Sequence, residues 1–327
     1  MATSLTIAVC TRKRVDLLKR CLDSVQAQVR TDGQSDLLVV DSVPTGDRVR
    51  LVAGAARARY VAVSRPGLDV ARNLALRTAR GDLIAFIDDD TVAAPDWIEA
   101  MRVSFSDPST ACVTGRVPPL ELRTEAQRLF EAYFSFDRGA APRRFTRSTD
   151  QPRLLLNPWG LGTGCNMAFR RRVFDLVGPF DEALDVGTPT GGGGDIDIFR
   201  RLLRAGFVVD YNPDAVIYHQ HRTSHAELYR QVWGYGKSYT ALMTKSVFVE
   251  RDMVDEAWSL ALCRLRQQVR RIGRRLLKRT GPPLGLLLVE TAGHLVGPLA
   301  FLQSMRRLRH DRQNAEGMLN AQPRQVD

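Results

Sequence analysis

A short apolar segment that ends in three aspartates constrains the fold of this chain most. Leu83–Ile87 follows a glycine and an aspartate and runs directly into Asp88, Asp89 and Asp90. Such a run predicts a buried β-strand, and open α/β sheets bind ligands at the carboxyl ends of their strands. Three adjacent carboxylates repel one another unless a cation offsets their charge. Because oxygen ligands favour Mg²⁺ or Mn²⁺, the segment predicts a metal that bridges substrate phosphates; the alternative is a solvated acidic turn.

Strand and helix patterns alternate along the first half of the chain and are less regular in the middle. The predicted strands are Leu5–Cys10, Asp36–Asp41, Tyr60–Ser64, Leu83–Asp88, Ala111–Val117 and Asp214–Tyr218. The predicted helices are Arg14–Gln28, Asp69–Ala79, Pro95–Phe105, Glu121–Phe136 and Asp195–Ala205. This alternation predicts an α/β fold with a Rossmann-like, mostly parallel central sheet and helices on both faces. Ala140–Asn157, rich in proline and arginine, is interpreted as a loop that shapes the pocket.

The chain divides into three predicted parts. Residues 1–225 form the α/β domain, 226–316 a helical, basic extension with a break at Gly281–Pro283, and 317–327 a disordered polar tail. The net charge is +11, and no acid interrupts the basic cluster Arg264–Arg279. No uncharged apolar run reaches transmembrane length. The neighbouring Leu284–Phe301, interrupted by Glu290 and His294, is typical of an interfacial helix.

The basic extension has two interpretations of equal weight. A polybasic stretch binds anionic lipid, which predicts a peripheral position on an anionic membrane surface. The alternative is a solvated face and a helix packed on the α/β domain. Nucleic acid is not an expected partner, because the charge lies outside any recognised binding module.

The cysteines and the N-terminus predict the cellular compartment. The five cysteines are odd in number and have no CxxC spacing, which argues against a disulfide framework or a zinc site and for a reducing environment. Met1–Ser4 leads into a strand without a signal-peptide pattern. We therefore expect a cytoplasmic protein, with a peripheral position at the inner face of the cell membrane as an option.

Polar residues stand where neighbouring strands are predicted to end. Thr11 and Arg12 follow the first strand, and Asp41 ends the second, so these side chains can line one pocket. Asp41 suits a ring nitrogen or ribose hydroxyl of a nucleoside, and Arg12 or Arg14 can approach phosphate. The alternative for Asp41 is a cap of the following turn.

The helix after the third strand adds two candidates. Arg72 and Asn73 lie early on Asp69–Ala79, beside the proposed metal strand, and a helix N-terminus with a nearby arginine favours anions. We interpret Asp69 itself as the N-cap of this helix.

Four glycines precede a pair of acids, and two histidines follow a late strand. Gly191–Gly194 suit a loop that moves or approaches a ligand closely. Asp195 and Asp197 point in different directions on a helix, so one can reach the pocket while the other binds locally; the alternative is a flexible loop with capping acids. His219 ends a strand, shares a face with His221, and is a suitable Mn²⁺ ligand beside carboxylates.

Taken in order, these residues resemble the inverting glycosyltransferases of family 2, which have the GT-A fold. The resemblance runs from Thr6–Arg14 to about Tyr239 and is greatest to bacterial members with a segment like Asn166–Arg171 and a loop like Gly187–Asp195. It implies that Asp88 and Asp90 form the DxD motif that holds metal and diphosphate, with Asp90 as the direct metal ligand.

The resemblance also implies roles outside the DxD motif. Asp41 contacts the base, Asp195 is the general base, and His219 matches a metal ligand of some members. Gly194 replaces the glutamate that normally precedes the general base, which leaves that residue's acceptor contact unassigned. The Gln-x-x-Arg-Trp motif of processive synthases is absent at Gln231–Trp233, which favours transfer of a single sugar.

The implied activity is metal-dependent transfer of one sugar from a nucleotide-diphosphate sugar to an acceptor hydroxyl. The acceptor is a glycan, a lipid-linked molecule or a small molecule, as in the synthesis of envelope polysaccharide or glycolipid, and the cofactor is Mn²⁺ or Mg²⁺. Two alternatives remain. A nucleotidyltransferase of related fold would usually carry a glycine-rich loop, absent at Cys10–Lys13, and a non-catalytic nucleotide-sugar-binding protein would not need Asp90 and Asp195.

Overall fold

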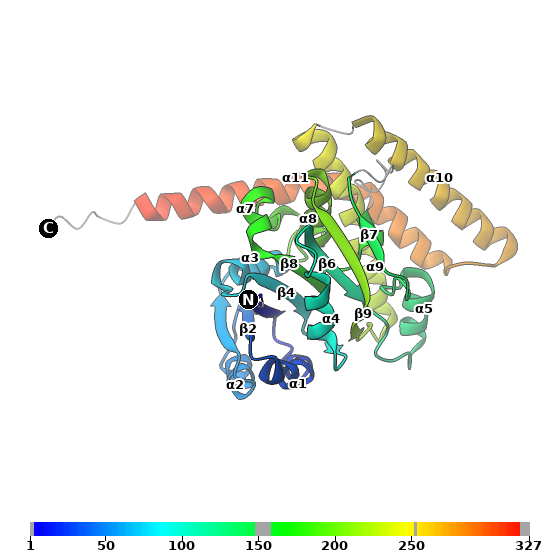
Figure 1. Cartoon of the computed structure of the whole chain (residues 1–327). Coiled ribbons are helices and arrows are strands. Elements are labelled where there is room, and N and C mark those ends of the chain that lie inside the picture. Colours follow the sequence, from blue (N-terminus) through cyan, green and yellow to red (C-terminus); the bar gives the residue numbers. More distant parts are fainter. Residues whose placement is uncertain (1–2, 148–157, 252–253, 321–327) are drawn as a thin grey trace.

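The computed structural model describes residues 3–147, 158–251 and 254–320 (Figure 1). The strands are β1 (Leu5–Thr11), β2 (Ser35–Ser42), β3 (Arg59–Val63), β4 (Leu83–Asp88), β5 (Thr91–Ala93), β6 (Thr110–Arg116), β7 (Arg143–Phe145), β8 (Asn166–Arg170) and β9 (Val208–His219). The longer helices are α1 (Val15–Asp32), α2 (Arg48–Ala55), α3 (Leu68–Thr78), α4 (Trp97–Ser104), α5 (Glu125–Phe134), α8 (Gly194–Arg204), α9 (His225–Lys245), α10 (Val254–Lys278) and α11 (Leu284–Asn320). Short helical turns are η1 (Pro158–Leu161), η2 (Arg171–Val173), α7 (Phe174–Val177), η3 (Glu182–Leu184) and the π-helical η4 (Ser246–Glu250).

The described strands form one mixed sheet in the order β3-β2-β1-β4-β8-β6-β9-β5, with β7 paired to β9. The half that carries the three aspartates is parallel, because β3, β2, β1 and β4 all run in the same direction. β8 then pairs antiparallel with both β4 and β6. The expected α/β architecture is confirmed, with antiparallel strands added beyond β4.

Alternate residues of the central strands enter two separate cores. Ile7 and Val9 of β1 pack with α1, α2 and α4 on one face of the sheet, whereas Ala8 and Cys10 pack with α3 and α8 on the other. A strand that is buried on both faces reads as a continuous apolar run, which is why β4 was recognisable in the sequence. Its carboxyl end is the first place where polar side chains can lie.

Several elements differ from the sequence predictions. β9 begins six residues earlier than predicted, and α2 and β5 had no predicted counterpart. Within the predicted loop Ala140–Asn157, Arg143–Phe145 form β7 against β9, and residues 148–157 lie outside the described part of the chain. Short segments such as β5 and β7 form through pairing with β9 rather than through a periodicity of their own.

The predicted start of α3 also needs correction. Asp69 is not the N-cap, because the helix begins at Leu68 after Gly67. The carboxylate of Asp185, distant in sequence, accepts from the backbone N–H groups of Leu68 (2.8 Å), Asp69 (3.0 Å) and Val70 (3.3 Å). Asp185 directly follows η3, in the segment 180–187 that is called here the η3 loop. This loop therefore caps α3.

Helix α11 packs closely on helix α9 through glycines. A Cβ at Gly293 of α11 would lie 2.7 Å from the Trp233 carbonyl oxygen of α9, and one at Gly297 would lie 2.0 Å from Thr240 Oγ1. Pro298 removes the N–H that would bind the His294 carbonyl, and the Thr240 hydroxyl donates to that oxygen instead at 2.8 Å. The first half of α11 therefore packs directly against the backbone of α9.

A buried carboxylate joins α10 to α11. Glu290 accepts from Arg264 (2.8 Å), Gln268 (3.0 Å) and Arg271 (2.8 Å), all on α10. Figure 1 shows the two helices as an antiparallel pair, while the C-terminal half of α11 extends away from the body. Two arginines of the basic cluster thus serve an internal ion-pair network rather than the surface.

The structure bears on two expectations for the C-terminal region, the membrane span and the disordered tail. In the described residues, Leu284–Asp311 is long and apolar enough to cross a membrane by length and composition, and 39% of its most apolar stretch is buried in the molecule; this is weak evidence for a span. α11 continues to Asn320, so residues 317–320 are helical rather than part of the expected tail, and residues 321–327 lie outside the described part.

Two glycine-to-alanine variants test the packing of α9 on α11. Gly297→Ala should lower the free energy of unfolding by about 1–3 kcal/mol, because its Cβ has no room beside Thr240. Gly273→Ala in α10 is the matched control: nothing lies within 4 Å of its added Cβ, so it should raise stability by about 0.5–1 kcal/mol through lower chain entropy. Thermal and urea unfolding measure both, and equal effects of the two variants would contradict the packing.

Candidate active site

The carboxyl ends of β1, β2 and β4 bring the predicted site residues to one edge of the sheet. Thr11 lies opposite Asp41 in the β1–β2 register, and Cys10 lies opposite Asp88 in the β1–β4 register. Asp41 is buried and its Oδ2 accepts from the Tyr60 hydroxyl at 3.1 Å. Burial raises the pKa of Asp41. The predicted meeting of adjacent strand ends is confirmed for these residues.

Asp89 and Asp90 are buried and held by polar side chains from β1 and the start of α1. Asp89 accepts from the Thr11 hydroxyl at 2.7 Å and from Arg14 Nη1 at 3.1 Å. The same Arg14 nitrogen donates to Asp90 Oδ2 at 2.9 Å. Arg12 is exposed and, within the described residues, forms no hydrogen bond with this group. Arg14 rather than Arg12 therefore faces the carboxylates.

Asp90 meets His219 because β5 pairs with β9. Thr91 lies opposite His219 in that register, and the Gln220 N–H donates to the Asp90 carbonyl at 2.9 Å. His219 Nε2 then lies 3.4 Å from Asp90 Oδ1. That oxygen is buried and has no hydrogen-bond partner among the described residues. An acceptor left unpaired at this depth is costly unless something else binds it.

The neutral state of His219 is maintained by its surroundings. Burial lowers the pKa of His219 to about 4, so the ring is neutral at pH 7. Its Nδ1 lies 3.0 Å from Nδ1 of His221, whose Nε2 lies 3.0 Å from Glu131 on α5. Nδ1 of His219 thus contacts His221, and Nε2 of His219 faces Asp90.

The pKa values of the three carboxylates shift in different directions. Burial and the neighbouring acids raise the pKa of Asp88 and of Asp89, against the opposing effect of Arg72 and Arg14 respectively. Burial would also raise the pKa of Asp90, but His219, Arg14 and Arg222 outweigh it, and the pKa lies below its usual value. Asp90 therefore has more compensating positive charge around it than Asp88 or Asp89 has.

The donor set fits a divalent metal only in part. Among the described residues, no group of three or more His, Cys, Asp or Glu side chains is placed to hold an ion. Asp90 Oδ1 and His219 Nε2 offer two ligands, and the unpaired Oδ1 is available for one. Mg²⁺ and Mn²⁺ sites of this kind are completed by substrate phosphates and water, so the residues fit a metal that binds together with a diphosphate.

Arg72 connects the aspartate cluster to the predicted general base. Its guanidinium donates to Asp69 Oδ1 (3.1 Å) and to the Gly164 carbonyl (3.0 Å), and it lies 3.7 Å from Asp88 Oδ1. The Gly164 N–H in turn donates to Asp195 Oδ2 at 2.8 Å. One residue, Gly164, therefore joins the arginine to the acid, and a Cβ there would lie 2.8 Å from both Arg72 Nη2 and Asp195 Oδ2.

Asp195 and Asp197 have the different environments that the sequence predicted. Asp195 is half-buried, and its Oδ1 accepts from the Ile196 N–H at 2.9 Å. Asp197 is fully buried, forms ion pairs with Lys245 (2.8 Å) and Arg201 (2.8 Å), and binds locally. Asp195 is the acid of this pair that keeps free lone pairs at the site.

The backbone conformation of the loop before Asp195 explains its run of glycines. Gly191, Gly192 and Gly193 have φ values of 76°, 134° and 114°, which other residues rarely adopt. A Cβ at Gly194 would lie 1.8 Å from Asp69 Oδ2. The loop therefore needs glycine for its backbone and for contact with Asp69, rather than for movement alone.

Asn73 is a predicted site residue whose amide contacts another loop, and Arg222 is a residue near the site that the sequence prediction did not include. Asn73 uses its amide on the backbone of Phe180 and on Glu182 Oε1 at 3.0 Å, so it positions the η3 loop. Arg222 was not predicted and lies 3.7 Å from Asp90 Oδ2. Its place in the chain, three residues after His219, was the available signal.

Comparisons with known proteins identify the family of this chain. Residues 6–178, just over half of the chain, match the family described as glycosyl transferase family 2. The chain belongs to this family. It is a glycosyltransferase. Membership of the family supports the expected nucleotide-sugar donor and acceptor, without specifying either.

Individual relatives are more distant. The succinoglycan biosynthesis protein ExoM of Rhizobium meliloti (strain 1021) is 25% identical over 269 residues, which are 78% of this chain and 79% of ExoM. The glucosyl-dolichyl phosphate glucuronosyltransferase of Haloferax volcanii is 30% identical over 54% of this chain and 56% of its own length. The match thus spans only about half of that second relative.

A solved structure shows the same fold. The mannosyltransferase PcManGT from Pyrobaculum calidifontis, solved in complex with GDP-Man and Mn²⁺, aligns with 98% of this chain and 79% of its own at 18% identity and a TM-score of 0.53. The predicted GT-A fold of this family 2 glycosyltransferase is confirmed.

The buried ion pair beside the site gives a stability prediction. Burial raises the pKa of Asp197, but Lys245 and the neighbouring arginines outweigh it and hold the pKa below its usual value of 3.8. Its contribution to stability is therefore present at neutral pH and is lost as pH falls below about 3.8. Lys245→Met should lower the free energy of unfolding at pH 7 by about 3–5 kcal/mol, because a buried charge loses a partner, and should move the acid loss to higher pH.

The control is Lys19→Met, which removes the exposed pair between Lys19 and Asp23. That pair should contribute less than about 0.5 kcal/mol. Urea unfolding from pH 3 to pH 8 compares the two variants. Equal stability losses would contradict the buried role of Lys245.

Proposed function

We propose that this protein is an inverting, metal-dependent glycosyltransferase that moves one sugar from a nucleotide-diphosphate sugar to an acceptor hydroxyl. The observation that carries the proposal is the buried carboxylate cluster at the end of β4, whose Asp90 Oδ1 is unpaired among the described residues and lies beside His219. The link through Arg72 and Gly164 to Asp195 supports a general base at the same site.

The donor is assigned to the edge of the sheet formed by β1, β2 and β4. Asp41, with Tyr60 beside it, accepts hydrogen bonds from the base or ribose. Arg14 and Arg72 face Asp88–Asp90 and stabilise negative charge on the diphosphate. Thr11 orients Asp89. Arg12, exposed next to Thr11, and Asn73 remain proposed donor-site residues. The amide of Asn73 also contacts Phe180 and Glu182.

The metal is assigned to Asp90 and His219, with Asp88 close to the diphosphate. When bound, Mn²⁺ or Mg²⁺ would supply positive charge to the departing nucleoside diphosphate. PcManGT, which shares the fold, was solved with GDP-Man and Mn²⁺ bound together, which supports the same pairing of sugar nucleotide and metal here.

The transfer step is a single displacement. An acceptor hydroxyl donates its proton to Asp195 as its oxygen attacks the anomeric carbon from the face opposite the diphosphate. The bond between the anomeric carbon and the phosphate oxygen breaks, and the nucleoside diphosphate leaves with both bonding electrons. Backbone N–H groups of Gly164 and Ile196 hold the two oxygens of Asp195 in place. The product has the opposite anomeric configuration to the donor.

A lipid-linked acceptor at the inner face of the cell membrane is the acceptor we favour. One relative's name specifies a dolichyl phosphate, and another's the biosynthesis of a polysaccharide, succinoglycan. We assign residues 1–225 to catalysis and 226–316 to a helical unit that brings the site to such an acceptor.

Turnover of nucleotide sugars by Asp195→Asn tests the general base. The variant should lose about 10²–10⁴-fold in kcat with KM for the donor nearly unchanged, because the donor contacts lie on other residues. Asp23→Asn, on the exposed face of α1, is the matched control and should keep wild-type rates. Donor and product are followed by NMR with Mn²⁺, Mg²⁺ or EDTA present.

Three results would contradict the proposal. Retention of the donor's anomeric configuration would exclude the single displacement. Full activity in EDTA would exclude the metal. Release of pyrophosphate from a nucleoside triphosphate and a sugar phosphate would identify a nucleotidyltransferase instead.

A further inference from the structure

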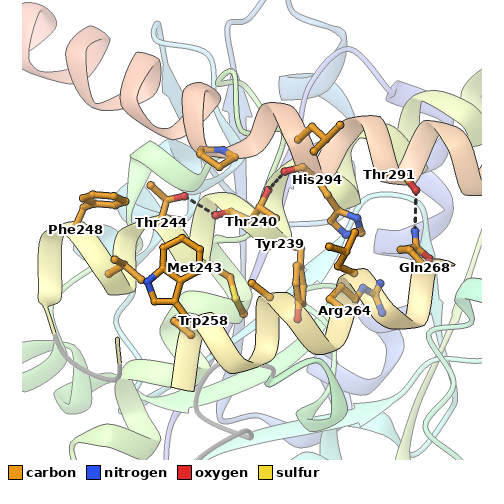
Figure 2. Close-up of a pocket in the computed structure, with 16 residues that line it drawn as sticks. Tyr239, Thr240, Met243, Thr244, Phe248, Trp258, Arg264, Gln268, Thr291 and His294 are labelled. Atoms are coloured by element: carbon orange, nitrogen blue, oxygen red, sulfur yellow. Dashed lines mark hydrogen bonds between the residues drawn. The ribbon is translucent and has the colours of Figure 1, made fainter. Parts of the chain in front are cut away.

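A cavity of about 400 Å³ lies outside the active site, between α9, α10 and α11. Figure 2 shows Tyr239 and Met243 from α9, Trp258 from α10 and His294 from α11 converging on it. Lys237, also on α9, donates to the carbonyl of Pro189, just before the glycine loop, at 2.7 Å. The volume lies in the range of small-molecule sites.

The polar groups in the cavity wall are mostly used by the protein itself. Thr240 donates to the His294 carbonyl at 2.8 Å, Gln268 donates to Glu290 at 3.0 Å, and Arg264 donates to Glu290 at 2.8 Å. His294 Nε2 is buried without a hydrogen-bond partner among the described residues. Few groups are left to bind a polar ligand, so the cavity suits an apolar one.

The rim of the cavity is exposed and apolar. Phe248, Trp258, Leu265 and Leu295 all line the cavity, and their exposed fractions are 66%, 60%, 57% and 78%. Further exposed apolar side chains continue from the rim at helical spacing: Leu262, Val269 and Leu276 on α10, and Leu288, Leu299 and Leu302 on α11. On each helix this spacing places them along one side, and these residues and the rim are called here the α10–α11 face. Exposed apolar side chains gathered in this way mark an interaction site.

Basic residues flank this face. Arg266, Arg270, Arg274 and Lys278 are exposed and follow one another at four-residue spacing, which places them along one side of α10. No acid lies between Arg264 and Arg279. An apolar stripe with a basic flank is the pattern of a helix that lies in an anionic membrane interface. A second copy of this chain would bring its own basic row against this one.

We propose that the α10–α11 face docks on an anionic bilayer and that the cavity takes up the hydrocarbon chain of one lipid from it. The basic row contacts lipid phosphates, the exposed leucines enter the interface, and the chain passes the rim to lie against Met243 and Ala261. α11 lies along the membrane rather than across it, because glycine contacts hold it to α9. The inference deepens the proposed function, resting on it only for the use of a membrane acceptor.

Two readouts test the two parts of this inference with the full chain. Co-sedimentation with vesicles of phosphatidylglycerol and phosphatidylcholine measures docking, and native mass spectrometry after gel filtration measures retained phosphatidylglycerol. The wild type should bind anionic vesicles at least 10-fold better than pure phosphatidylcholine and should carry one lipid. Arg270→Glu with Arg274→Glu should lower the vesicle partition by about 100-fold or more, since each charge near the surface contributes about 1 kcal/mol.

Filling the cavity separates lipid uptake from docking. Ala261→Phe places a ring inside the cavity and should abolish the retained lipid, while vesicle binding stays within about threefold of wild type. Leu176→Phe is the control, because it adds a ring at an exposed position of α7 that belongs neither to the cavity lining nor to the α10–α11 face, and it should keep the lipid. Thermal unfolding establishes that each variant is folded.

The contradicting results are equally distinct. Lipid retained by Ala261→Phe at the wild-type level would overturn the cavity assignment, and absence of vesicle binding by the wild type would overturn the docking. Donor hydrolysis without vesicles is measured on the same preparations. If hydrolysis is normal and lipid binding is absent, only this inference fails; if hydrolysis is absent and lipid binding is normal, the proposed function fails.

Discussion

The burial of three adjacent carboxylates at the end of β4 is the constraint on which the rest of the site depends. Arg14, Arg72 and Arg222 approach the cluster, yet burial still raises the pKa of Asp88 and Asp89. A metal bound with a diphosphate would add charge of both signs: the cation meets the carboxylates and the phosphates meet the arginines. Such a balance would suit an edge of the sheet where buried acids and arginines lie together.

The site is held together by contacts between segments far apart in the sequence. Arg72 and Gly164 join the aspartate cluster to Asp195, and Asp185 caps the helix that carries Arg72. α9 then supports the loop before Asp195 on one side and lines the lipid-sized cavity on the other. α9 therefore contacts both the loop before Asp195 and the cavity, so a shift of α9 would affect both.

The parts of the fold with a strong local pattern could be predicted, and those made by distant contacts could not. β4 and its aspartates were recognisable because a strand buried on both faces is continuously apolar. The cap of α3 was assigned to Asp69, although Asp185 provides it from more than 100 residues away. Arg222 reaches Asp90 only because β5 pairs with β9. The need for glycine at 194 follows from the carboxylate of Asp69, which the sequence places nowhere near it.

The central claim is that Asp90 binds a metal together with a nucleoside diphosphate, and electron paramagnetic resonance of Mn²⁺ measures this directly. Free Mn²⁺ is titrated with protein in the presence and absence of GDP, UDP, ADP and dTDP. The account predicts weak Mn²⁺ binding by the protein alone, binding at least about 10-fold tighter with one of the diphosphates, and loss of that gain in Asp90→Ala. Equal Mn²⁺ affinity in wild type and Asp90→Ala, with every nucleotide, would contradict it.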